Sequence, residues 1–138
     1  MPTFEVHMKE NVFTHEEKEG LAKALNLALH EAMGTPMEDQ FIFFTEHKED
    51  EFYFTPTFPN MHRTDKRIMV NVSFGESRTL EQKQKLAELV TRYAMEKAGV
   101  GPDDVSMMMY ALPLENMTFG RGRLITDIDL SMPWVDKK

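Results

Sequence analysis

The alternation of apolar and polar positions predicts a strand, a helix and a second strand in the first third of the chain. Residues 3–8 alternate strictly, which is typical of a strand with one buried face. Apolar residues then recur at helical spacing from Thr14, an N-cap with a glutamate three residues later, to Gly34, a C-cap. Residues 40–45 are almost continuously apolar, so we expect a strand buried on both faces.

The second half of the chain repeats this order. Residues 67–74 predict a strand, Ser77 or Thr79 opens a helix that runs to Gly99, and residues 105–112 predict a further strand. The halves align without a gap at an offset of 65 residues, with eight identities. The identical pairs are Thr14/Thr79, Glu16/Glu81, Lys18/Lys83, Leu21/Leu86, Ala22/Ala87, Glu31/Glu96, Gly34/Gly99 and Asp39/Asp104.

This repeat predicts one domain, residues 1–138, of the α/β (α+β) class. Two β-α-β units, over about 2–46 and 67–112, would each join parallel strands by a right-handed crossover. Together they would form a four-stranded mixed sheet with two helices on one face. The polar connection 46–66 contains a candidate short strand at Phe52–Phe54, and 113–138 would form a hairpin and tail.

The other face of such a sheet would be uncovered. Strands as apolar as these do not tolerate water on that face, so we expect the chain to oligomerise through it.

Composition excludes several classes of function. The chain of 138 residues carries a net charge of −7, which disfavours nucleic acid and anionic membranes as partners. It has no cysteine, so disulfides, thiolate metal sites and a cysteine nucleophile are excluded. No apolar run approaches the roughly 20 residues of a membrane helix, and residues 1–12 do not form a signal peptide. A cytoplasmic protein is the expectation.

Four stretches carry a resemblance to the tautomerase superfamily over essentially the whole chain: "MPTFEV", "GTPMEDQFIFFTEH", "ESRTLEQKQKL" and "LPLENMTFGRGRL". The chain is similar to two groups within it, the malonate semialdehyde decarboxylases and the cis-3-chloroacrylic acid dehalogenases. The resemblance implies a tautomerase-like homotrimer and an amino-terminal proline as catalytic base.

Pro2 and Arg78 are the first candidate site residues. Once Met1 is removed, Pro2 is a secondary amine; α-amino groups have a pKa of about 7.7–8.0, and burial or cationic neighbours lower it. A neutral prolyl amine could move a proton at carbon. By the resemblance, Arg78 in "SRT" holds the substrate carboxylate. The structural alternatives are a tolerated strand start for Pro2 and a surface pair with Glu76 or Glu81 for Arg78.

Four further residues are candidates. The decarboxylase group carries a functional aspartate beside the proline at the place of Asp39, although Asp104 occupies the same place in the second half and favours a turn role. In "TFGRGR", Phe119 could line an apolar pocket, and Arg121 or Arg123 could supply a second cation. A hairpin that packs against another subunit is an equal alternative. His30 is expected to be a surface histidine, and no histidines are spaced as a metal pair.

Departures from both groups decide the expected reaction. The dehalogenases carry two loop arginines and a glutamate that activates water, whereas this chain has Gly75 near the place of one arginine and Thr118 and Phe119 in the glutamate's region. The decarboxylases also carry two arginines, and Glu76 replaces the first. A base, a carboxylate clamp and an apolar pocket suffice for proton transfer without cofactor or metal.

We therefore predict an isomerase that tautomerises a small carboxylate substrate, a 2-oxo or 2-hydroxy-enoic acid such as phenylenolpyruvate. The alternatives are a hydratase, decarboxylase or dehalogenase acting on malonate semialdehyde or a 3-haloacrylate, and a non-catalytic trimeric binding protein.

Overall fold

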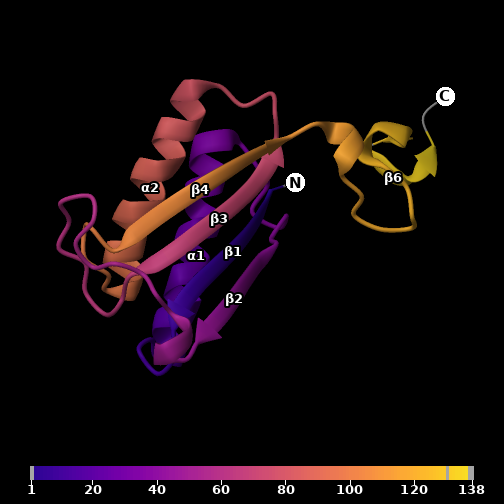
Figure 1. Cartoon of the computed structure of the whole chain (residues 1–138). Helices are drawn as coiled ribbons and strands as arrows, with labels where there is room; N and C mark the ends of the chain where they lie inside the picture. The colour runs from indigo at the N-terminus through magenta and orange to yellow at the C-terminus, as the bar shows by residue number, and fades with distance from the viewer. Residues whose placement is uncertain (1, 130, 137–138) are drawn as a thin grey trace.

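The six elements expected for the two repeats are present in the computed structural model, which describes residues 2–129 and 131–136. They are β1 (Thr3–Lys9), α1 (His15–Met33) and β2 (Ile42–His47) in the first unit, and β3 (Ile68–Gly75), α2 (Leu80–Ala98) and β4 (Val105–Leu112) in the second. The sheet has the order β2-β1-β3-β4, with β1 parallel to β2, β3 parallel to β4 and β1 antiparallel to β3. Both helices cover one face (Figure 1), which confirms the predicted fold class.

Each helix begins and ends where its capping residues predict. Thr14 and Glu17 form a reciprocal capping box at the start of α1, and Thr79 forms one with Gln82 at the start of α2. Both helices end at a glycine with a left-handed backbone, φ 72° at the end of α1 and φ 68° at the end of α2. Within the described part of the chain, no helix is long and apolar enough to cross a membrane.

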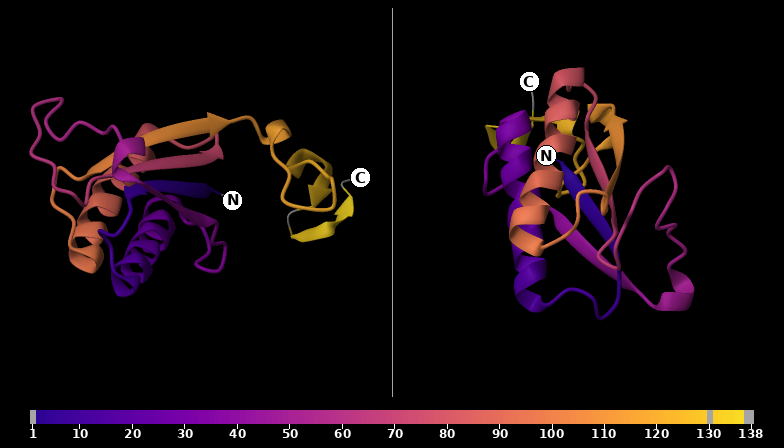
Figure 2. Two further views of the ribbon diagram at one scale, coloured as in Figure 1. Left: turned by 60° about the horizontal axis from the view of Figure 1, so that its bottom comes forward. Right: turned by 90° about the vertical axis from the view of Figure 1, so that its left-hand side faces the viewer.

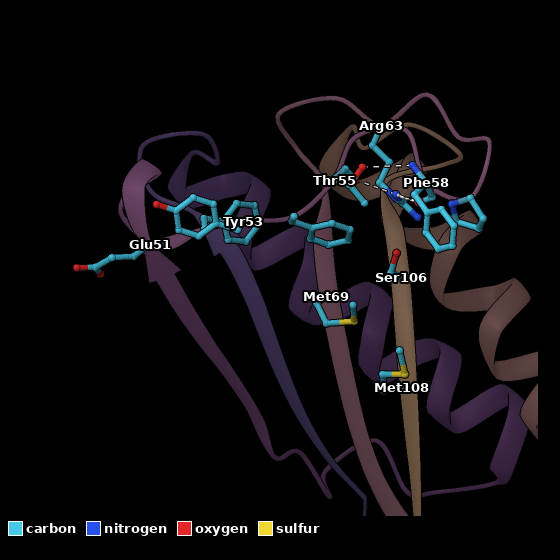
Figure 3. Close-up of a pocket in the computed structure, with 11 residues that line it drawn as sticks. Glu51, Tyr53, Thr55, Phe58, Arg63, Met69, Ser106 and Met108 are labelled. Atoms are coloured by element: carbon cyan, nitrogen blue, oxygen red, sulfur yellow. Dashed lines mark hydrogen bonds between the residues drawn. The ribbon is translucent and has the colours of Figure 1, made fainter.

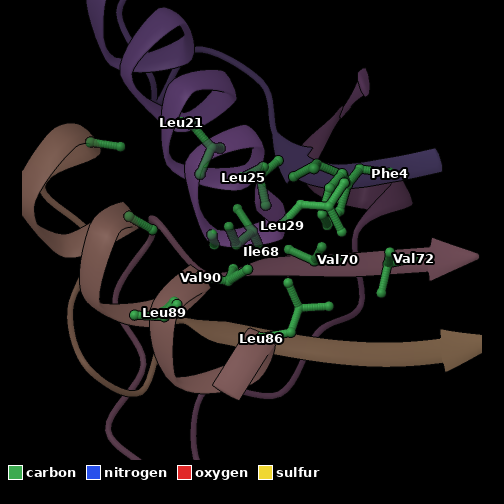
Figure 4. Packing of buried hydrophobic residues seen from close by; sticks show 14 of the residues in the cluster. Phe4, Leu21, Leu25, Leu29, Ile68, Val70, Val72, Leu86, Leu89 and Val90 are labelled. Carbon is green, nitrogen blue, oxygen red and sulfur yellow. The ribbon is translucent and has the colours of Figure 1, made fainter. Parts of the chain in front are cut away.

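One layer of apolar side chains fills the space between the sheet and the helices (Figure 4). Alternate residues of β1 and β3 are fully buried there, as strand periodicity requires. The helices contribute residues at three- and four-residue spacing. Central members of this core are Phe4, Val6, Met8, Leu21, Leu25, Leu29, Ile68, Val70, Val72, Leu86 and Val90.

The repeat is in phase at 65 residues only from the first helix onward. Phe4 pairs with Ile42 in the first unit, as Val70 pairs with Met107 in the second. Met107 follows Ile42 by 65 residues, but Val70 follows Phe4 by 66. The ungapped alignment is therefore wrong for β1 and β3, because the loop before α1 is one residue longer than the loop before α2.

The face of the sheet away from the helices is mixed rather than apolar. Glu5, Asn71, Ser73 and Tyr110 line a polar hollow of about 240 Å³ on β1, β3 and β4. The expectation of β2 as a strand buried on both faces is wrong for the single chain: β2 is an edge strand, and Phe43 is 57% exposed. Only the edges of this face therefore expose the large apolar side chains that contact with another copy would bury.

The connection between the units folds back over this open face of the sheet. The short strand predicted at Phe52–Phe54 is wrong: the only regular element that the described connection contains is a 3-10 helix at Glu49–Glu51. Side-chain bonds to backbone fasten the segment instead, with Arg67 Nε donating to Phe54 O at 2.7 Å and Arg63 Nη1 to Thr55 O at 2.8 Å.

The C-terminal segment projects away from the sheet as an arm beyond the end of β4 (Figures 1 and 2). It contains two short 3-10 helices, Leu114–Asn116 and Ile125–Asp127, and the antiparallel strands β5 (Ile128–Asp129) and β6 (Met132–Asp136). Its small core consists of Met117, Ile125 and Ile128, with Leu112 and Phe119 packed against it. Residues 130, 137 and 138 of the predicted tail lie outside the described residues.

Candidate active site

Pro2 lies at the edge of the sheet where β1 and β2 begin and β3 ends. It is buried and directly precedes β1. Proline has no N–H to donate inside a chain, and at the start of a strand this costs the sheet no internal hydrogen bond. Phe4 N donates to Phe41 O at 2.8 Å, so the loop that leads into β2 enters the sheet at the edge where β1 begins. Asp39 lies in this loop, three residues before β2, and therefore at the same edge of the sheet as Pro2; Met1 lies outside the described residues.

Arg78 reaches this edge from the loop between β3 and α2. Its side chain is partly buried, and its Nη1 donates to the carbonyl oxygen of Met33 at 3.0 Å, at the C-terminal end of α1. The negative end of the helix dipole favours a cation there. Its Nε is buried and has no hydrogen-bond partner within the described residues, and no ion pair joins Arg78 to Glu76 or Glu81 there.

Asp39 and Asp104 differ sharply although the repeat aligns them. Asp104 is fully buried, and its carboxylate accepts bonds from Gly101 N at 2.7 Å and from Thr64 N at 2.6 Å. Asp39 is partly exposed, and no hydrogen bond reaches its carboxylate from the described residues. The turn role that fits Asp104 therefore does not extend to the side chain of Asp39.

The three candidate residues of the turn 119–123 differ in their burial. Phe119 is partly buried, and its ring lies 5.3 Å from the ring of Phe41, whose carbonyl accepts the bond from β1. This contact places Phe119 near the Pro2 edge. Arg121 and Arg123 are exposed on the turn, so the single chain gives them no enclosed binding position.

Two residues that hold the loop before β2 were missed by sequence reasoning. Asn26 in α1 is 8% exposed, and its Nδ2 donates to Met37 O at 2.8 Å. His30, expected as a surface histidine, is exposed, but its Nδ1 lies 2.8 Å from Thr35 O. A buried asparagine within the apolar stripe of α1 was the available signal, because a buried amide needs a partner.

A separate cavity of about 580 Å³ lies under the connection on the open face of the sheet (Figure 3). Its walls are Phe52, Phe54, Phe58, Met69 and Met108, together with six other residues. Met69 pairs with His7, five residues from Pro2, so roughly 16 Å of strand separates this cavity from the proline. The cavity is therefore not part of the Pro2 site within one chain.

Sequence spacing also could not show that His7 and His47 meet. His7 Nδ1 lies 2.8 Å from His47 Nε2 on neighbouring parallel strands, so one ring donates to the other. Within the described residues, no group of three histidine, aspartate or glutamate side chains could hold a metal ion.

Comparison with known proteins gives consistent matches. A family model described as "Tautomerase enzyme" matches residues 39–120, more than half of the chain, in a range that does not include Pro2. The chain is 26% identical over 123 residues to the probable tautomerase YusQ of Bacillus subtilis (strain 168), covering 89% of this chain and 96% of that protein.

Solved structures of low sequence identity share the fold. Malonate semialdehyde decarboxylase superposes with a TM-score of 0.80 at 24% identity, covering 88% of this chain and 92% of that one. N1, a member of the cis-3-chloroacrylic acid dehalogenase family, gives 0.74 at 18% identity, covering 96% and 85%. A fused 4-OT described as a symmetric trimer gives 0.73 at 21% identity, covering 88% and 94%.

Proposed function

Because the chain belongs to the tautomerase family, we propose that it is a cofactor-independent tautomerase of 2-oxo or 2-hydroxy-enoic acids such as phenylenolpyruvate. Pro2 is the general base, and Arg78 binds the substrate carboxylate. After removal of Met1, the amine of Pro2 would lie two residues before Phe4 of the apolar core, and apolar surroundings favour the neutral form of an amine.

The anchored guanidinium of Arg78 is the observation that carries the proposal. The side chain is only partly buried, so a substrate carboxylate could bind the part of the planar group that is not committed to Met33 O. The bond from Nη1 to Met33 O already fixes the orientation of the planar group. Arg78 is thus preorganised as a clamp rather than as a freely moving surface side chain.

The proposed reaction needs only a proton shuttle. In the ketonisation of an enol, the neutral nitrogen of Pro2 takes the hydroxyl proton as the C2–oxygen double bond forms, and C3 then receives a proton from the prolyl ammonium. In the reverse direction the same nitrogen removes the C3 proton, and the oxygen is protonated. Arg78 holds C1 of the acid so that C3 stays within reach of the nitrogen.

The assembly is proposed to be a homotrimer. The fused 4-OT that shares this fold forms a symmetric trimer, which supports this assembly. Phe43 and Met108, which are exposed at the two edges of the open sheet face, also support it, because contact with another copy would bury them. In such an assembly Phe119, Arg121 and Arg123, which the arm carries, could line a site together with a neighbouring copy.

A second candidate reaction is hydration or decarboxylation of malonate semialdehyde. The carboxylate of Asp39, which accepts no hydrogen bond from the described residues and lies at the same edge of the sheet as Pro2, favours it. Such a group can orient or activate water while a protonated Pro2 serves as acid. The similarity in fold to malonate semialdehyde decarboxylase is compatible with this alternative.

The test begins with the intact mass of the purified protein, since retention of Met1 blocks the amine and contradicts every mechanism that uses Pro2. Wild type and Pro2→Ala are then compared on phenylenolpyruvate, malonate semialdehyde and 3-haloacrylates. We expect ketonisation by wild type and a loss of at least about a hundredfold in Pro2→Ala, the lower end of the range for a proton-transfer group. Equal rates would instead support a non-catalytic binding protein.

A further inference from the structure

The two units hold the segment before their second strand in different ways. In the second unit Asp104 holds it: the buried carboxylate collects the N–H of Gly101 and both the N–H and hydroxyl of Thr64. These three hydrogen bonds tie the loop before β4 to the connection and fill most of the roughly four acceptor positions of the buried carboxylate.

In the first unit the same network cannot form around Asp39. The residue aligned with Gly101 is Pro36, which has no N–H to donate. The donor that Gly101 supplies to Asp104 is therefore absent around Asp39, whose carboxylate accepts no hydrogen bond from the described residues.

α1 holds the first loop instead. Asn26 donates to Met37 O, and the ring of His30 bonds to Thr35 O, both at 2.8 Å. The aligned residues in α2 are Thr91 and Met95, and within the described residues neither side chain bonds to the loop before β4. Asparagine is a poor helix former, and its buried amide costs free energy unless it is hydrogen-bonded. The bond to Met37 O satisfies this amide and holds the loop, which an apolar residue at this position could not do.

We propose that Asn26 is a positioning residue that holds the loop 35–38 in place of Asp39, leaving the Asp39 carboxylate unbonded at the Pro2 edge of the sheet to contact the substrate. This inference rests on the proposed function, because it assigns Asp39 to the Pro2 site. Asn26 itself touches no substrate. It acts through the Met37 carbonyl, two residues before Asp39.

The activity test compares Asn26→Leu, which keeps the branching at Cγ but removes the donor, with Thr91→Leu at the aligned position of α2. We expect Asn26→Leu to lower kcat/KM roughly tenfold on the best substrate of the panel, because small misplacements of a reacting group slow catalysis strongly. Thr91→Leu should leave it unchanged. In an Asp39→Asn background, Asn26→Leu should have almost no further effect.

Hydrogen exchange measured by mass spectrometry gives a readout that does not need activity. Asn26→Leu should speed amide exchange in residues 35–41 and leave residues 100–105 protected. Unchanged exchange in 35–41, or a tenfold loss that persists in the Asp39→Asn background, would overturn the assignment.

The two proposals fail in distinguishable ways. If Asp39→Asn alone retains full kcat/KM while Pro2→Ala is inactive, the role given to Asn26 is wrong and the proposed function stands. If Pro2→Ala is also fully active, the proposed function fails, and the inference that rests on it falls with it.

Discussion

Arg78 combines an anchored donor with an unsatisfied one. Nη1 is committed to Met33 O, while the buried Nε has no partner within the described residues. Lysine at this position would keep the charge but not the planar fork, so it could not hold the helix end and a carboxylate together.

We predict that Arg78→Lys lowers kcat/KM for the carboxylate substrate roughly 10- to 150-fold, mainly through a higher KM. This corresponds to the loss of about 1.5–3 kcal/mol for a hydrogen bond to a charged group. Steady-state kinetics at a fixed pH measure the change. Arg92→Lys, on an exposed position of α2, is the matched control and should leave kcat/KM unchanged. A wild-type KM in Arg78→Lys would contradict the clamp.

Pro2, Asp39 and Arg78 can be named as candidates from the sequence because motifs and the repeat mark them; their roles stay predictions. Asn26 cannot be named in this way, since a bond from a side chain to a distant carbonyl depends on the path of the loop. The contrast between Pro36 and Gly101 is nevertheless readable in the sequence, once the bonds of Asp104 are known. The repeat predicts a turn role for Asp39 because it aligns Asp39 with Asp104. The prediction does not take into account that Pro36, aligned with Gly101, has no N–H to donate.

At the scale of elements, Glu17 joins the start of α1 to the connection and to the end of α2. Its Oε1 accepts the N–H of Thr14 at 2.9 Å, and its Oε2 pairs with Lys66, which also donates to Ala98 O at 3.2 Å. The pairing with Lys66 holds the pKa of Glu17 below its usual range, and the bond from the Thr14 backbone adds to this effect.

A carboxyl group whose pKa is depressed by folding stabilises the fold above its unfolded pKa, and this contribution disappears as the pH falls through the folded pKa. Glu17→Gln keeps a capping box like that of Gln82 in α2 but removes the charge. We predict that it lowers the free energy of unfolding by about 0.5–1 kcal/mol at pH 7. The difference should shrink as the pH falls below the usual range of a glutamate pKa, because the folded-state pKa of Glu17 is lowered. Denaturant unfolding over a pH series measures this. The exposed Glu16→Gln should show no comparable pH-dependent difference, and an equal effect of both variants would contradict the role of Lys66.

Element boundaries could be predicted closely because caps and periodicity are local signals. The offset between β1 and β3 could not, because one extra residue in the loop before α1 changes no helical phase. Alternation within a strand shows which residues share a face, but it does not show how the strand is paired with its neighbour. The neighbouring strands set this register, which pairs Phe4 with Ile42 and Val70 with Met107.

At the scale of the whole molecule, the fold has a covered face and an open one. The centre of the open face is polar, which explains why the sequence argument for a wholly apolar face was too simple. Apolar exposure is concentrated at the edges, where Phe43 on β2 is 57% exposed and Met108 on β4 is 52% exposed. Burial of these edges by neighbouring copies would also give the projecting arm a surface to pack on.

This arrangement leads to a prediction for the assembly. Met107 and Met109 pack towards the core, so Met108 points to the open face, whereas Met95 is exposed on α2 at the covered side. Met108→Lys would bury a charge wherever β4 meets another copy, at a cost of several kcal/mol. We expect light scattering coupled to size-exclusion chromatography to give three chain masses for wild type and for Met95→Lys, and one for Met108→Lys at micromolar concentration. An unchanged trimer in Met108→Lys would place the contacts between copies elsewhere than on the open face, and the arm would then be the next surface to test.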